Sequence, residues 1–165
     1  MSAVLPGRIL AIDLGDRRVG LAISDPTRLI AQPAGHLDRR AGKRPPLTAL
    51  LAKASEVGAT AFVVGLPLDE AGDDTPRAAE ARRLAHELES RTGHPARVLD
   101  ERFTTAAALR AVRAMEGSTR GRRGDVDALA ATVLLEQALA QGERLFERAA
   151  ENGSARTTTD GDDDA

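Results

Sequence analysis

The chain has 165 residues, of which 42% are hydrophobic and 29% charged, and its net charge is −2. This length and composition fit one globular domain with a substantial core. The absence of Cys excludes disulfides and thiolate sites, and three Phe with no Tyr or Trp argue against a single-strand-binding module built on aromatic stacking. With neither a signal peptide nor an apolar stretch of roughly 20 residues, we expect a cytoplasmic protein with no membrane partner.

The charges are divided unevenly along the chain. Residues 151–165 contain one Arg and five acidic residues, whereas the preceding 150 residues contain 22 basic and 20 acidic ones. The last segment is polar and has no hydrophobic periodicity, which is typical of disorder. We therefore predict one domain over residues 1–150, followed by a disordered acidic tail over residues 151–165.

The chain opens with two apolar runs that predict strands over residues 8–14 and 18–24. The short turn "GDRR" between them requires antiparallel pairing. Asp25, in "SDP", is expected to form the turn that follows. A weaker strand is expected over residues 28–37, where Pro33 suggests an edge position. These elements predict an antiparallel meander.

The rest of the chain alternates between helical and strand patterns. The predicted helices cover residues 46–58, 75–91, 104–115 and 125–147, and the predicted strands cover residues 61–66 and 96–101. Such alternation indicates parallel strands with helices covering the sheet. We therefore predict an α/β fold with a five-stranded mixed sheet flanked by helices.

Acidic residues stand at the ends of three predicted elements. Asp13 lies at the end of the first apolar strand, Asp100 and Glu101 end the last strand, and Asp125 and Asp127 open the last helix. Ligands of sheets with parallel strands gather at the carboxyl ends of the strands. We expect the first and last strands to lie side by side, which would bring Asp13 close to the acidic pair.

Geometry limits how many of these acids can share one site. Neighbouring strand residues face opposite sides, so only one of Asp100 and Glu101 should enter the site. Asp125 and Asp127 are about 200° apart on a helix. Asp127 continues the apolar stripe of its helix, while Asp125 follows Gly124 and is suited to cap the helix. Asp127 is therefore the predicted ligand; the ordinary role of such acids is to form turns or caps.

A cluster of carboxylates in a partly buried site needs cations to remain ionised. Ligands that are oxygen atoms alone suit Mg²⁺ or Mn²⁺. Two such ions about 4 Å apart could activate a water molecule and stabilise the leaving oxygen of a phosphodiester. The pattern therefore predicts a hydrolase with two divalent ions, and a cation would explain a carboxylate at the buried position of Asp13.

Four segments in order resemble the motifs of one family. They are "AIDLGDRRVGLAISD", "VVGLPLDEAGDD", "LDERFTT" and "DVDALAATVLLEQAL", and they span most of residues 8–140. Together they resemble the YqgF/RuvX family, a branch of the RNase H-like nucleases. The resemblance implies an RNase H-like fold and a metal-dependent nuclease in which Asp13, Glu101 and Asp127 are the catalytic and metal-binding residues.

The resemblance also implies a substrate and further contact residues. Bacterial members are associated with trimming the 5′ end of precursor 16S ribosomal RNA, in ribosome biogenesis, and are alternatively described as Holliday junction resolvases. Matching positions that would contact nucleic acid are Arg17, Arg18, Gly65, Arg102, Thr105, Arg120, Arg122 and Arg123. The last three Arg would form a phosphate clamp or a solvated loop, and Thr104 is expected to cap a helix.

Two rival functions remain open from the sequence. The segment "DLGDRRVG" also resembles the phosphate-binding turn of sugar kinases and actin-like ATPases, which need roughly twice this length. A non-catalytic RNA-binding module of the same fold is the other alternative. The expected partner is structured RNA, with branched DNA as the alternative, and the chain could act as a monomer or a homodimer.

Overall fold

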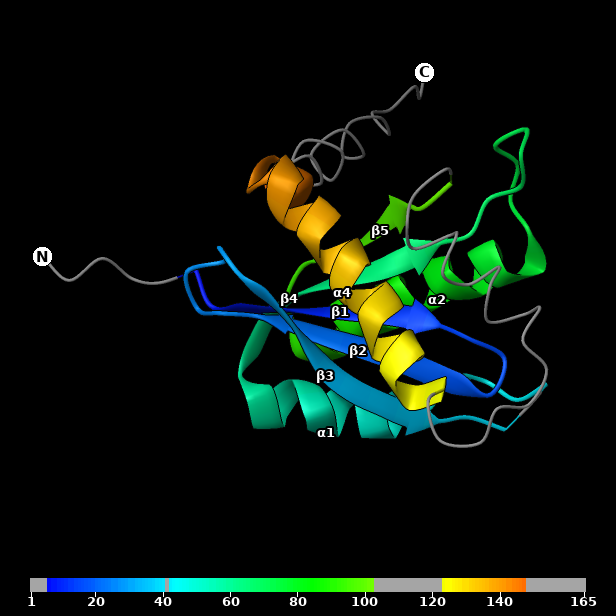
Figure 1. Cartoon of the computed structure of the whole chain (residues 1–165), viewed down its shortest axis with the longest axis horizontal. Helices are drawn as coiled ribbons and strands as arrows, with labels where there is room; N and C mark the ends of the chain where they lie inside the picture. The colour runs from blue at the N-terminus through cyan, green and yellow to red at the C-terminus, as the bar shows by residue number, and fades with distance from the viewer. Residues whose placement is uncertain (1–5, 41, 103–122, 148–165) are drawn as a thin grey trace, which may run out of the picture.

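The computed structural model describes residues 6–40, 42–102 and 123–147. Its elements are β1 (Arg8–Leu14), β2 (Arg18–Ser24), β3 (Ala31–Asp38), α1 (Leu47–Val57), β4 (Ala59–Leu66), α2 (Pro76–Thr92), β5 (Ala96–Asp100) and α4 (Arg123–Gln141). The strands form one sheet in the order β3-β2-β1-β4-β5, antiparallel from β3 to β1 and parallel from β1 to β5 (Figure 1). The predicted five-stranded mixed sheet, with an antiparallel meander followed by parallel strands, is confirmed.

Both faces of the central strands are covered by helices. Successive side chains of β1 alternate between the faces, and all but the first of its residues are buried. Leu10 and Ile12 belong to the core shared with α1 and α2, whereas Ile9 and Ala11 belong to the core shared with α4. Figure 1 shows α4 crossing the front of the sheet. This explains why the sequence of β1 reads as a continuous apolar run.

The predicted starts and ends of the first two helices are confirmed. The Thr75 side chain caps α2 by accepting a hydrogen bond from the Ala78 backbone N–H at 3.1 Å, and Pro76 occupies the first turn. Gly58 and Gly93 end α1 and α2 in the left-handed conformation, with φ of 68° and 71°.

The third strand is shorter at its start than predicted, because Asp25 organises a longer turn. Its carboxylate accepts hydrogen bonds from the backbone N–H groups of Leu29 at 2.8 Å and Ile30 at 2.7 Å. The Thr27 hydroxyl also donates to this carboxylate, and together with these backbone bonds it holds the pKa of Asp25 well below its usual range. β3 therefore begins at Ala31, and it forms an edge of the sheet, as Pro33 suggested.

The last helix differs from its prediction at both ends. α4 begins at Arg123, so Asp125 lies inside its first turn and is not its N-cap. Gly124 weakens a helix without ending it. The helix ends at Gln141 because Gly142 adopts a φ of 67°, and residues 144–147 form a separate helical turn. The helix predicted over residues 104–115 and the tail over residues 151–165 lie outside the described residues.

The expectation that the first and last strands lie side by side is wrong. β4 lies between β1 and β5 and pairs in parallel with both. Seven of the eight residues of β4 are buried, which suits a strand with neighbours on both sides. β5 is shorter and only partly buried, which suits an edge strand.

No helix in the described parts of the chain is long and apolar enough to cross a membrane.

The close approach of α4 to β2 at Gly20 supports a first prediction. A Cβ atom added to Gly20 of β2 would lie 2.1 Å from the backbone oxygen of Asp127, so the two backbones leave no room for a side chain. Gly20→Ala should displace α4 and lower the free energy of unfolding by about 3 kcal/mol, the upper end for overpacked cores. Urea denaturation measures this change.

The matched control is His36→Ala, at the exposed β3 position that pairs with Gly20. It should change the free energy of unfolding by less than about 0.5 kcal/mol. Equal stability of Gly20→Ala and the unsubstituted protein would contradict the close approach.

Candidate active site

Asp13 is buried at the C-terminal end of β1, with glycines beside it in the sheet. Its side chain lies on the α4 face, and the residue is 1% exposed. In β2 it pairs with Gly20. In β4, Ile12 pairs with Val64, so the next residue, Gly65, comes alongside Asp13. With no side chain on either neighbour, the sheet leaves space around the Asp13 carboxylate on the α4 face.

Asp127 reaches this space from above. Its backbone oxygen lies directly over Gly20, the partner of Asp13, and Asp127 is 1% exposed. Ala131 and Leu134, four and seven residues further along α4, are fully buried against the same face. The prediction that Asp127 begins the buried stripe of α4 is thus confirmed, and the helix places the backbone of Asp127 over the cross-strand partner of Asp13.

The acids at the end of β5 face opposite sides, as the alternation of strand residues requires. Asp100 is turned outward and accepts hydrogen bonds from the Arg102 guanidinium, with Nη2–Oδ2 at 2.8 Å and Nε–Oδ2 at 3.1 Å. Glu101 is 2% exposed, and its backbone N–H donates to Leu66 O at 3.4 Å. Glu101, and not Asp100, is therefore the buried acid of this pair.

Burial and the negative charge of Asp100 shift the pKa of Glu101 in the same direction. Its burial, assisted by the nearby negative charge of Asp100, raises the pKa of Glu101 to about 7. The positive charge of Arg77, in the first turn of α2, opposes this shift. Arg77 is held at this end of the sheet, where its Nη1 donates to Leu14 O at 3.1 Å and its Nη2 pairs with Asp16.

The spacing of the acids follows from the strand order. Asp13 and Glu101 belong to strands separated by β4, so their backbones are about 10 Å apart, twice the spacing of neighbouring strands. Among residues 6–40, 42–102 and 123–147, no three His, Cys, Asp or Glu side chains converge into a metal-binding group. The three buried carboxylates therefore line a shared face without forming a closed metal cage.

The donor types nevertheless fit a hard divalent cation. Asp13, Glu101 and Asp127 offer oxygen atoms alone, in a buried setting where negative charge is costly. Mg²⁺ is commonly held by one or two carboxylates that share it with water molecules and substrate phosphates. A complete protein cage is therefore not required for these residues to take part in binding Mg²⁺ or Mn²⁺.

Four of the predicted contact residues lie in or next to the strands of the sheet. Arg17 is exposed in the turn after β1, and Arg18 begins β2 with its Nε 3.9 Å from Asp38 Oδ1. Gly65 lies in β4 between the strands that carry Asp13 and Glu101. Arg102 is engaged by Asp100.

Of the remaining predicted contact residues, Arg123 is the one that lies within the described residues. Arg123 is the first residue of α4 and not part of a loop. Thr104, Thr105, Arg120 and Arg122 lie outside the described residues. Sequence reasoning did not single out Arg77, which reaches the site from a helix more than 60 residues after Asp13; no local pattern in the sequence reveals this contact.

The chain is similar to known proteins over most of its length. Residues 7–141 match the sequence profile of the family described as "RuvX: Holliday junction resolvase". A protein of Roseiflexus sp. (strain RS-1) named "Putative pre-16S rRNA nuclease" is 37% identical over 134 residues, which cover 81% of this chain and 94% of that protein. A protein of Koribacter versatilis with the same name is 42% identical over 130 residues, 79% of this chain and 84% of that protein.

Among solved structures, Thermus thermophilus RuvC is similar to this chain with a TM-score of 0.49 and 13% sequence identity. The similarity covers 84% of this chain and 97% of that one.

The raised pKa of Glu101 predicts how stability depends on pH without divalent ions. Between the ordinary value of 4.5 and about 7, the folded protein holds a proton that the unfolded chain has lost. This contribution is complete below pH 4.5 and is lost as pH rises through about 7. The free energy of unfolding should fall over this interval by roughly 3 kcal/mol, from the size of the pKa shift.

Urea denaturation at several pH values in a chelator measures this decline, which Glu101→Gln should abolish. Glu56→Gln, at an exposed position of α1, is the control and should retain the decline. The same pH dependence in Glu101→Gln would show that another group causes it.

Proposed function

This chain belongs to the RuvX family, and on that premise we propose that it is a metal-dependent nuclease that processes the 5′ end of precursor 16S ribosomal RNA. The observation that carries the proposal is the burial of Asp13, Glu101 and Asp127 on one face of the sheet. Burying carboxylates is costly, and a module that only bound phosphates would gain nothing from them. The names of the Roseiflexus and Koribacter relatives support ribosomal RNA as the substrate.

In this proposal each side chain has a distinct task. Asp13, Glu101 and Asp127 would hold Mg²⁺ or Mn²⁺, as two ions. Such cations, when bound, supply activation of water and stabilisation of the leaving oxygen. The Glu101 carboxyl must lose its proton to act as a ligand, so binding should release a proton near neutral pH. Packing of α4 over Asp13 excludes bulk water, which strengthens electrostatic interactions at the scissile phosphate.

Arginine side chains would orient the nucleic acid strand. Arg102 is bound to Asp100 in a forked arrangement that a phosphate group can also accept. A substrate phosphate at this edge could therefore replace Asp100 as the partner of Arg102. The other proposed contacts are made by Arg17, Arg18, Thr105, Arg120, Arg122 and Arg123. Gly65, which has no side chain, would let the nucleic acid strand come close to the protein backbone of β4.

Cleavage of Holliday junctions is the second candidate, favoured by the description of the family. Symmetric cleavage of a junction needs two sites related by a two-fold axis, and hence a homodimer. Trimming of RNA needs a single site and is open to a monomer. The proposal also places the protein in the cytoplasm, with one catalytic domain over residues 1–150 and an acidic tail over residues 151–165.

The decisive test compares two substrates under identical conditions. A 5′-extended 16S precursor RNA and a four-way DNA junction are incubated with Mg²⁺ or Mn²⁺, and the products are mapped. We expect the RNA to be trimmed, and Asp13→Asn to reduce the rate at least about 100-fold because a ligand of the cation is lost. Glu56→Gln, at an exposed position of α1, should cleave at the unsubstituted rate.

Paired symmetric cuts in the junction, with intact RNA, would assign the protein to recombination. If the folded protein binds RNA but neither it nor Asp13→Asn cleaves either substrate, the non-catalytic RNA-binding module becomes the better description.

A further inference from the structure

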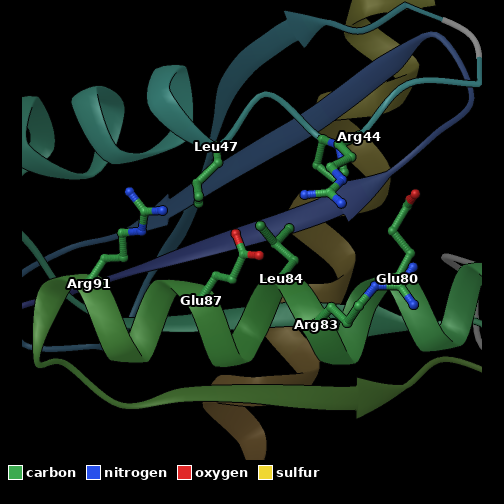
Figure 2. Close-up of a pocket in the computed structure, with 8 residues that line it drawn as sticks. Arg44, Leu47, Glu80, Arg83, Leu84, Glu87 and Arg91 are labelled. Atoms are coloured by element: carbon green, nitrogen blue, oxygen red, sulfur yellow. The ribbon is translucent and has the colours of Figure 1, made fainter.

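A groove lies on the face of the sheet opposite α4, between α2 and the segment that leads into α1. Its volume is about 510 Å³. The side chains that define it include Arg44, Leu47, Arg83, Leu84, Glu87 and Arg91 (Figure 2). Leu84 is buried and Leu47 is half-buried, so the floor of the groove is apolar, while the exposed arginines form its rim.

The rim arginines are not committed to carboxylates within the described parts of the chain. Seven other arginines form ion pairs there, whereas Arg44, Arg83 and Arg91 form none. Glu87 stands between Arg83 and Arg91 on α2, and none of the ion pairs among the described residues joins it to either. Three exposed guanidinium groups therefore remain available to an external anion.

The other carboxylate at the groove is already neutralised. Glu80 accepts two hydrogen bonds from Arg39, with Oε1–Nη1 at 2.7 Å and Oε2–Nη2 at 2.6 Å. The Arg39 side chain is 7% exposed, and that of Glu80 is 21% exposed. Because this pair cancels its own charge, the groove has three positive groups against the single negative charge of Glu87.

Both walls of the groove are anchored at the edge of the sheet where Asp13 lies. Arg39, at the start of the segment that leads to Arg44, donates from its backbone N–H to Arg17 O at 2.8 Å and from its Nη1 to Gly15 O at 3.1 Å. On the opposite wall, Arg77 of α2 donates to Leu14 O at 3.1 Å. The groove therefore begins beside the turn that follows Asp13 and runs along α2 away from the active site.

We propose that this groove binds the phosphate backbone of the substrate nucleic acid outside the point of cleavage, an inference that rests on the proposed nuclease function. Arg83 and Arg91 are eight residues apart on α2, about 12 Å along the helix axis. Figure 2 shows Arg44 and Arg91 toward opposite ends of the groove. Cations spread in this way suit successive phosphates of a polymer, whereas a single small anion would need converging donors.

The positive charge of the groove would by itself also suit binding of an acidic protein. The nucleic acid is favoured because the groove starts at the edge of the candidate active site, so a strand held at Asp13 reaches it without leaving the surface. A strand on this path would pass the turn at Arg17 and then the guanidinium of Arg44. The groove would thereby raise the affinity for the substrate and fix the position of the strand relative to the active site, whose own acids repel phosphate.

The test is RNA binding by the full chain in a chelator, where no cleavage occurs, at a series of salt concentrations. The probe is the 5′-extended precursor 16S RNA. The double variant Arg83→Gln with Arg91→Gln should bind roughly tenfold more weakly, and the slope of log affinity against log salt should become shallower by about 1.5, as expected for two lost phosphate contacts. The control, Arg82→Gln with Arg144→Gln, removes equal charge outside the groove and should match the unsubstituted chain.

Equal binding and equal slope for the groove variant and the control would overturn the proposal and leave an acidic protein as the better occupant. Equal weakening in both variants would also overturn it, since the effect would then come from net charge. Cleavage with Mn²⁺ separates this inference from the nuclease assignment. If the groove variant alone binds RNA more weakly but the unsubstituted chain cleaves no RNA, the groove proposal is supported and the nuclease assignment is refuted. If the unsubstituted chain cleaves RNA but the groove variant binds RNA as tightly as the control, the nuclease assignment is supported and the groove proposal is refuted.

Discussion

The arrangement of the candidate site depends on the contact between the backbone of α4 and Gly20. A helix normally stands off a sheet by the length of the side chains between them. Here β2 carries no side chain at the point of contact, and the backbone of Asp127 occupies the position that a Cβ atom would take. The same contact places Asp127 over the cross-strand partner of Asp13 and closes this part of the site against solvent. The absence of a side chain at Gly20 therefore determines both how closely α4 packs on β2 and where Asp127 lies in the site.

The electrostatics of the site follow from the burial of its acids. Glu101 and Asp100 are adjacent in sequence, yet the pleat of the strand sends them into different surroundings. Asp100 meets Arg102, which holds the pKa of Asp100 below its usual range. Glu101 is buried, and this burial raises its pKa. A divalent cation would offset the free-energy cost of burying these negative charges. The burial of the carboxylates, which lowers the stability of the metal-free protein near neutral pH, therefore also favours metal binding.

The two faces of the sheet share the edge at which β1 ends. On one face, α4 covers the buried acids; on the other, α2 and the segment before α1 form the basic groove. Arg39 and Arg77 connect these regions, since each donates to backbone oxygens that directly follow Asp13. The buried acids and the exposed arginines of the groove are thereby kept apart on opposite faces. This separation prevents the two sets of charges from neutralising each other, which a single mixed cluster would allow.

The sequence by itself determined the first two strands of the meander, the helix boundaries at Thr75 and Gly58, and the place of Asp127 at the start of the buried stripe of α4, because periodicity, capping and turn chemistry are local properties. Only the tertiary structure decided that β4 separates β1 from β5, because pairing between distant strands depends on how every face is covered. It also decided that Arg77 acts near Glu101 and that Arg39 neutralises Glu80. These contacts join residues about 25 to 40 positions apart, and no local pattern records them.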